Sequence, residues 1–388
     1  MVIGVHTTFV SGFTGRSGIG NYTSRLEIGV SVFFVISGFL LYRPFAVAHF
    51  ADTASPSIPA FWVRRLKRIV PAYWIAFFVI TYVLHGDTPI RHGWGSLAIY
   101  LGFAQIYSPH YVLTGITAAW SLCTEMSFYL ALPLWAAFVG RRRRPPDAQL
   151  RVELVGLAAL TVASFAFRTW ALQWHTREAA TMVNWLPADT DLFALGMLLA
   201  VVSAYLQATN RRPGWLWHPA LPFVSWTLAL GALVAVSNIG LPLTPVTPSA
   251  IGLSLARQTW YGLFAFFVVA PAVFGPQERG VIRGLLQTRV LVLVGVVSYG
   301  VYLWHEAAIS LFLRWTGDRL FTIPLWQLAG FVTALAILFA TASYLLVERP
   351  VLRGGIRLPH RPAARPGPVP GPAPALGPIA AATPAGPS

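Results

Sequence analysis

A single histidine at position 6 interrupts the apolar stretch VIGVHTTF (2–9). An ionisable side chain inside a membrane helix is costly to bury and is, by default, a candidate functional residue. Burial favours the neutral imidazole, which can accept a proton near pH 7. His6 is therefore predicted to act as a general base that activates a hydroxyl group, and a structural polar contact is the alternative.

Two arginines three residues apart, Arg65 and Arg68, lie in the basic segment RRLKRIVP (64–71). On a helix this spacing places both side chains on one face, where two guanidinium groups can hold phosphate oxygens bidentately. The pair is therefore a candidate for binding the phosphates of a cytoplasmic donor such as acyl-CoA. A positively charged anchor that only orients the neighbouring membrane span is the alternative, and spacing alone favours it.

An acidic residue, Glu125, lies one turn into the apolar segment AWSLCTEMSFYLALPL. Ser121 precedes it by four residues and Tyr129 follows it by four, so the three side chains share one helical face. Because an intramembrane carboxylate is costly without a partner or a function, Glu125 is expected to orient His6, hold an acceptor hydroxyl, or pair with an arginine. A purely structural pair with an arginine of another span is the alternative.

A further polar group lies in VSYGVYLWHEA (297–307), where Ser298, Tyr302 and His305 fall on adjacent faces of an apolar helix. They are candidates for binding the acceptor or supporting the site. A cluster of aromatic and histidine side chains at a membrane interface is the alternative. The segment VERPVLR (347–353) is interpreted as structural, because its proline stops a helix.

The amino-acid composition indicates that these residues belong to a membrane protein. Of the 388 residues, 56% are hydrophobic and 11% are charged, whereas an ordinary soluble domain has roughly 25% charged residues. The formal net charge of +15 comes from short clusters between apolar runs, which is typical of cytoplasmic loops and argues against a nucleic-acid partner. The single cysteine, Cys123, excludes an intrachain disulfide framework and a cysteine-based zinc cluster. The expected partner is the lipid bilayer, with no bound cofactor and no metal.

The apolar runs predict an all-α, polytopic transmembrane helical bundle, because about 20 apolar residues are needed to cross the hydrocarbon core. Spans are expected near residues 28–45, 69–84, 118–139, 152–172, 188–206, 221–238, 256–274, 290–313 and 325–347. The opening apolar run, 2–10, is interpreted as the second half of a truncated first helix, which gives about ten spans; a short interfacial segment is the alternative. The stretch 94–107 is too short to span and is expected at the outer interface.

Loop charges predict the orientation. Short basic segments are retained on the cytoplasmic side, and they lie at 64–68, 141–144, 211–212, 278–289 and 348–357. Both termini are then cytoplasmic, in a multi-pass protein of the cell (inner or plasma) membrane. Residues 1–357 form the predicted transmembrane domain, and the Pro/Ala/Gly-rich segment 358–388 is predicted to be a disordered tail.

Taken in order, these segments resemble the membrane acyltransferase family 3, a group of bacterial integral-membrane O-acyltransferases. The landmarks after His6 are FFVISGFLLYRPF (33–45), FWVRRLKRIVPAYW (61–74), WSLCTEMSFYLALPL (120–134), SYGVYLWH (298–305) and VERP (347–350). The family acylates hydroxyls of envelope polysaccharides, peptidoglycan, lipid-linked sugars and macrolides. The resemblance therefore implies a cytoplasmic acyl-CoA donor and a hydroxyl-bearing glycan or secondary-metabolite acceptor.

The resemblance also assigns residues. The family's essential histidine corresponds to His6, its RxxR donor-binding motif to Arg65 and Arg68, and its acidic residue after WSL to Glu125. One feature departs from the family pattern, since an arginine usually found about eleven residues before the histidine has no counterpart in the five residues before His6. An N-terminally truncated, inactive relative is therefore one alternative, and a transporter or flippase of a lipid-linked glycan is another.

The mechanism expected from this resemblance is direct transfer of an acyl group, acetyl or another short chain, to an acceptor hydroxyl. Arg65 and Arg68 hold the CoA phosphates, the acyl arm reaches into the bundle, and His6 takes the hydroxyl proton. A covalent route, in which His6 carries the acyl group transiently, is the competing mechanism.

Overall fold

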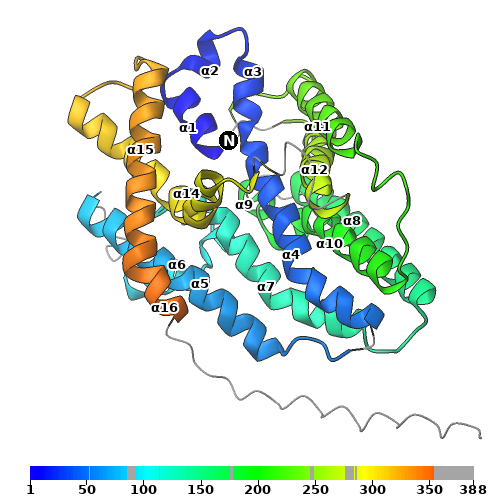
Figure 1. Cartoon of the computed structure of the whole chain (residues 1–388). Helices are drawn as coiled ribbons and strands as arrows, with labels where there is room; N and C mark the ends of the chain where they lie inside the picture. The colour runs from blue at the N-terminus through cyan, green and yellow to red at the C-terminus, as the bar shows by residue number, and fades with distance from the viewer. Residues whose placement is uncertain are drawn as a thin grey trace, which may run out of the picture. The chain divides into compact units, whose positions relative to one another are not determined.

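The computed structural model describes residues 1–51, 53–84, 93–112, 114–174, 178–244, 249–275, 284 and 286–353. All regular elements in these ranges are helices, as Figure 1 shows. The predicted all-α class is therefore confirmed. The predicted tail, 358–388, lies outside the described residues.

Long helices lie at all nine positions where spans were predicted. They are α4 (Gly29–Ala51), α5 (Ile58–Phe78), α7 (Trp120–Val139), α8 (Pro146–Trp174), α10 (Leu186–Ala208), α11 (Leu221–Ser237), α12 (Ile251–Val273), α14 (Arg289–Thr316) and α15 (Leu325–Ser343). Two of them continue as π-helical turns, α5 into Val79–Leu84 and α15 into Tyr344–Glu348, and α16 (Arg349–Arg353) follows the second.

Short helices connect the long ones. They are α1 (Val2–Val10), α2 (Phe13–Arg16), α3 (Gly20–Thr23), α6 (Trp94–Leu101) and α9 (Ala179–Met182), with 3₁₀ turns at Ser24–Ile28, Gln105–Tyr107 and Thr117–Ala119. The stretch 94–107 thus forms a helix of eight residues and a 3₁₀ turn, which is too short to cross a bilayer. This agrees with the prediction that the stretch does not span the bilayer, and its interfacial position stays a prediction.

Seven helical segments of the described chain are long and apolar enough to cross a membrane. They are Gly20–Ala51, Ile58–Leu84, Thr117–Val139, Pro146–Trp174, Leu186–Ala208, Arg289–Thr316 and Leu325–Arg353. The helix α11 has 17 residues and falls short in length, and α12 is not among the seven. The protein is therefore a multi-pass membrane protein, and the count of ten spans is not confirmed.

The start of α5 differs from the sequence prediction. A span was expected to begin at residue 69, after the basic segment, but the helix begins at Ile58 with Pro59 in its first turn, a position that proline favours. Arg65 and Arg68 therefore belong to the helix rather than to a loop. Their spacing places them on one helical face, as predicted.

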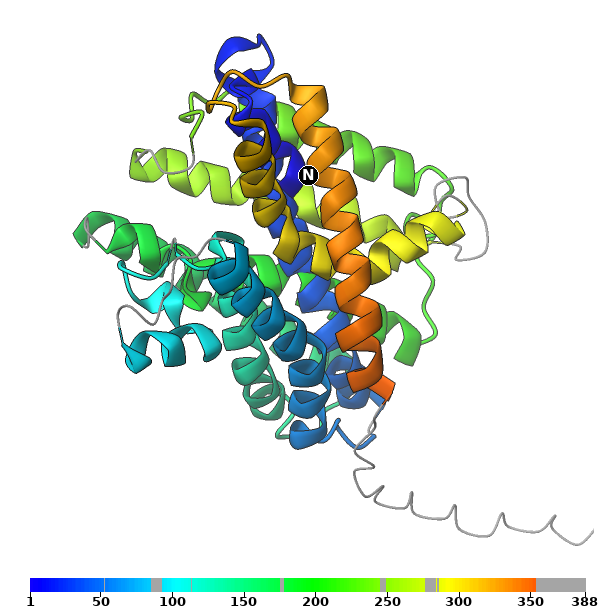
Figure 2. The same ribbon diagram turned by 90° about the vertical axis from the view of Figure 1, so that its left-hand side faces the viewer.

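Close helix contacts hold the centre of the bundle together. The helices α4 and α10 cross where Gly38 faces Gly196, and a Cβ at Gly196 would lie 2.0 Å from the Val35 carbonyl oxygen. Glycine at such a crossing lets two backbones approach, as is common between membrane helices. The helices α14 and α15 run side by side (Figure 2) and meet where Gly300 packs on Ala340.

Candidate active site

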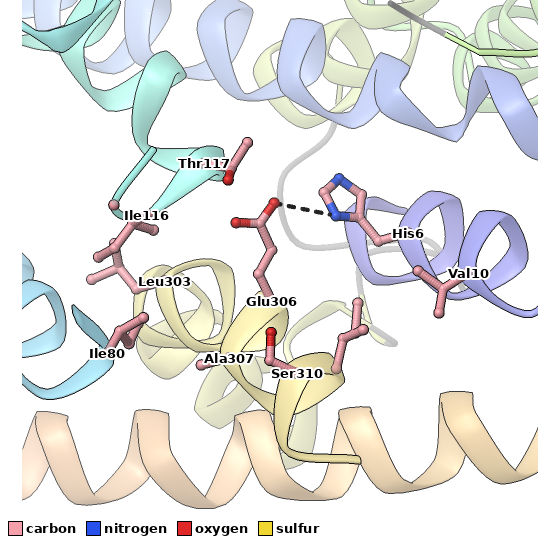
Figure 3. A pocket seen from close by; sticks show the side chains of 11 residues that line it. His6, Val10, Ile80, Ile116, Thr117, Leu303, Glu306, Ala307 and Ser310 are labelled. Carbon is pink, nitrogen blue, oxygen red and sulfur yellow. Dashed lines mark ion pairs between the residues drawn. The ribbon is translucent and has the colours of Figure 1, made fainter. Parts of the chain in front are cut away.

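The centre of the candidate site is a histidine and a carboxylate from opposite ends of the chain. His6, on α1, places its Nδ1 3.4 Å from Oε1 of Glu306, on α14 (Figure 3). The His6 side chain is 35% exposed and that of Glu306 is 22% exposed. The other carboxylate oxygen of Glu306 accepts a hydrogen bond of 3.1 Å from the backbone N–H of Ala118. Because Ala118 lies at the amino end of the Thr117–Val139 helical segment, the helix dipole also favours a negative charge on Glu306.

A second histidine packs against the first. The rings of His6 and His305 meet edge to face, with their centroids 4.9 Å apart. Nδ1 of His305 lies 2.7 Å from the carbonyl oxygen of Tyr302, so the proton of the neutral ring belongs on Nδ1. Its Nε2 is buried and has no hydrogen-bond partner among the described residues. His305 therefore presents an unprotonated nitrogen inside the bundle.

A cavity of about 220 Å³ opens beside His6 and Glu306 (Figure 3). Its wall combines the two ionisable side chains with two hydroxyl residues and a larger apolar surface. It is lined by His6, Val10, Ile80, Gly115, Ile116, Thr117, Leu303, Glu306, Ala307, Ile309 and Ser310. A small cavity that carries a proton-accepting histidine at one edge can hold a reacting group and little bulk solvent.

Of the other residues predicted on α14, Tyr302 lies near Glu306 and Ser298 lies on the exposed surface. The hydroxyl of Tyr302 lies 2.8 Å from that of Ser121 and donates to the Ala118 carbonyl oxygen at 2.6 Å, so it joins α14 to the amino end of α7 beside Glu306. Ser298 is exposed and donates to the backbone of its own helix at Gly295. The structure therefore places His305 against His6 and Tyr302 against His305, with Ser121 hydrogen-bonded to Tyr302, and it leaves Ser298 outside the site.

Glu125 belongs to a separate polar cluster near the arginines of α5. It is buried, accepts a hydrogen bond of 2.7 Å from Ser37, and is hydrogen-bonded by Tyr129. Arg65 and Arg68 lie close enough to act on its charge. The expectation that Glu125 orients His6 is not met, because the carboxylate beside that ring is Glu306.

Two arginines inside other helices pair with carboxylates other than Glu125: Arg168 of α8 with Asp189 at 2.9 Å, and Arg257 of α12 with Glu27 at 3.7 Å. A structural role for Glu125 beside Arg65 and Arg68 stays an alternative.

Arg65 and Arg68 lie on α5, nearer to its amino end than the cavity-lining residue Ile80. Arg68 is exposed and Arg65 is half-buried. Arg68 precedes Ile80, a lining residue, by twelve positions, which is about 18 Å of helix at 1.5 Å per residue. Neither arginine lines the cavity. The cavity beside His6 therefore does not itself extend to the two arginines.

Sequence reasoning missed Glu306, although a signal was present. Its neighbour His305 was singled out, and an acidic residue in an apolar helix merits the same attention as Glu125. One donor atom from each of His6, His305 and Glu306 lies within 4.8 Å of the others, and two histidines with a carboxylate form a set that zinc accepts. The expectation of no metal remains a prediction.

Comparison with known proteins was consistent with a transferase. The family described as acyltransferase domain (acyltransferase 3) matches residues 1–346. Among relatives, the acyltransferase MdmB of Streptomyces mycarofaciens is 28% identical over 350 residues, which cover 85% of this chain and 82% of the relative. The exopolysaccharide production protein ExoZ of Rhizobium meliloti is 27% identical, over 87% of this chain and 92% of its own length.

A Staphylococcus aureus protein that carries the name of an O-acetyltransferase is 25% identical over 85% of this chain, which spans only 53% of that relative. No solved structure matches the chain. The family match covers nearly all of the described helices, and one landmark, SYGVYLWH (298–305), lies on α14, which lines the cavity. The chain therefore belongs to the acyltransferase 3 family of membrane acyltransferases.

Proposed function

We propose that the protein moves a short acyl group, such as acetyl, from acyl-CoA to a hydroxyl of a carbohydrate or of a glycosylated or lipid-linked acceptor. The observation that carries this proposal is the pairing of His6 with Glu306 at the edge of a cavity inside a membrane acyltransferase. The name of the relative ExoZ, an exopolysaccharide production protein, supports a carbohydrate acceptor.

The chemistry uses the two nitrogens of His6 in different ways. Nδ1 faces Glu306, so this nitrogen carries the proton and Nε2 is left as the acceptor. Nε2 takes the proton of the acceptor hydroxyl as its oxygen attacks the thioester carbonyl. The C–S bond breaks, the CoA thiolate leaves, and the imidazolium returns the proton to the sulfur. Base assistance of this kind is typically worth 10²–10⁴-fold in rate.

Donor binding belongs to the cytoplasmic end of α5. Arg65 and Arg68 hold the CoA phosphates, and the acyl thioester reaches the cavity at Ile80 over a helix length of about 18 Å from Arg68, which an extended pantetheine arm can cover. The two arginines lie outside the cavity, so the pantetheine arm must extend from them along α5. Glu125, with its hydroxyl partners Ser37 and Tyr129, lies near the arginines, where this path begins.

The orientation follows from the loop charges. The Arg141–Arg144 cluster and the basic end of α5 face the cytoplasm. The acceptor then meets His6 on the part of the bundle remote from the arginines.

The test is mass-spectrometric analysis of candidate acceptors after incubation with acetyl-CoA and purified protein in nanodiscs. The proposal predicts a glycan or glycoside product heavier by one acetyl group, formed together with free CoA. Acetyl-CoA that stays intact in the presence of every carbohydrate acceptor tried would overturn it. A burst of acetylated protein before acceptor is added would support the acyl-histidine route instead.

A further inference from the structure

The cavity beside His6 has an apolar side that the transfer chemistry leaves unused. We propose that Ile80, Ile116, Leu303 and Ala307 form the subsite for the alkyl part of the acyl group, and that their side chains set the longest acyl chain the enzyme accepts. This inference rests on the proposed function and adds to it the residues that select the donor.

The lining residues are arranged as a thioester requires. Figure 3 shows Ile80, Ile116 and Leu303 together on one side of the cavity and His6 on the other, with Glu306 between them. A carbonyl placed near His6 would direct its alkyl group toward the three aliphatic side chains. Burying that alkyl group is favourable because apolar surface leaves water.

The volume limits the chain length. An engineered apolar cavity of about 150 Å³ holds one benzene molecule, six carbon atoms. In the same proportion, the 220 Å³ beside His6 would hold about nine heavy atoms. The carbonyl group, the sulfur and the attacking acceptor oxygen occupy part of that space. The remainder suits an acyl group of a few carbons and excludes a fatty acyl chain.

The apolar wall is rigid, so it can act as a limit. Ile80, Ile116, Leu303 and Ala307 are all buried, and close-packed interiors do not enlarge freely. Gly115 shows how tightly the wall is built, since it has φ +73° and a Cβ there would lie 3.1 Å from Tyr100 and 3.2 Å from Phe77.

The helix geometry at Ile80 is also unusual. This residue lies in the π-helical turn Val79–Leu84 at the end of α5. Such turns inside helices are rare and often accompany functional sites. The wider turn changes the direction in which α5 presents its side chains, and it is at this turn that the helix contributes Ile80 to the cavity.

The experiment compares acetyl-, propionyl-, butyryl- and hexanoyl-CoA as donors for two variants that alter the wall in opposite directions. Ile80→Ala enlarges the cavity, and Ala307→Val fills it. The matched control is Ile75→Ala, which makes the same change on the exposed surface of α5. Since one methylene in an apolar pocket changes discrimination by about 10–200-fold, the butyryl-to-acetyl ratio of kcat/KM should rise about tenfold in Ile80→Ala and fall by a similar factor in Ala307→Val.

The control should keep the wild-type ratio. The inference is overturned if acetyl transfer persists in both wall variants and the donor ratios stay as in the wild type. A variant that fails to fold is recognised by a thermal unfolding temperature below that of the wild type. The donor ratio of the other wall variant, Ile80→Ala or Ala307→Val, then tests the inference by itself. Failure of the proposed function itself looks different, because the wild-type protein would transfer no acyl group at all.

Discussion

Replacing Glu306 with glutamine removes the negative charge beside His6 and keeps the shape of the side chain. The charge acts when His6 takes a proton, because the imidazolium then lies 3.4 Å from the carboxylate oxygen. At that separation two unit charges attract by about 1.2 kcal/mol at the dielectric constant of water and by about 5 kcal/mol at an effective value of 20. His6 is 35% exposed, so solvent screening places the effect in the lower half of this range.

An effect of about 1.5–3 kcal/mol on the transition state corresponds to a fall in kcat of roughly 10–160-fold. The assay is the steady-state rate of CoA release with saturating acetyl-CoA and acceptor, measured for wild type and Glu306→Gln in nanodiscs. The KM for acetyl-CoA should change little, because Glu306 is remote from the arginines of α5.

The pH profile separates this role from a structural one. Wild-type activity should fall on acidification as His6 is protonated, since only the neutral ring accepts a proton. Without the anion beside it the imidazolium is less stable, so the fall in Glu306→Gln should begin at a lower pH than in wild type. Equal kcat values, or a profile that falls at the same pH in both proteins, would refute the pairing of Glu306 with His6.

Three further predictions concern the donor site, the orientation and the metal. Arg65→Ala with Arg68→Ala should raise the KM for acetyl-CoA more than it lowers kcat, because a phosphate contact far from the reacting atoms acts on ground and transition states alike; an unchanged KM would return the pair to an anchor role. A cysteine at Arg142 should escape a membrane-impermeant thiol reagent applied to intact cells, whereas one at His110, in the exposed loop before α7, should react; the reverse pattern would invert the topology. Chelators should leave acyl transfer unchanged, since the donor set of His6, His305 and Glu306 is interpreted as metal-free; loss of activity that zinc restores would contradict this.

The sequence predicted the helices well and their ends less well. Apolar runs near 20 residues identify membrane spans because the bilayer tolerates few polar side chains. The error at α5 has a simple cause, since hydropathy marks where the hydrocarbon ends and not where the helix ends. Arginine, leucine and lysine are good helix formers, so the basic segment continues the helix beyond the apolar span and carries Arg65 and Arg68 with it.

The sequence identified single residues of the site but not which of them pair with one another. Single residues such as His6 and His305 were recognisable because ionisable side chains are rare in apolar helices. Which carboxylate faces His6 depends on how α1 packs against α14, and nothing local to either segment specifies that contact. Glu125 was favoured by its place in a recognised motif, whereas the partner is Glu306, 300 positions after His6 in the chain.

The most direct measurement is acetyl-CoA turnover by His6→Ala beside wild type. Both proteins would be purified, placed in the same nanodiscs and given the same acceptor, with CoA release and acetylated product followed together. His6→Gln serves as the second variant, because an amide keeps the polarity of the site but cannot take a proton near pH 7. We expect wild type to form product and both variants to form none while they keep the wild-type thermal stability. Product formation by either variant at the wild-type rate would contradict the assignment of His6 as the base.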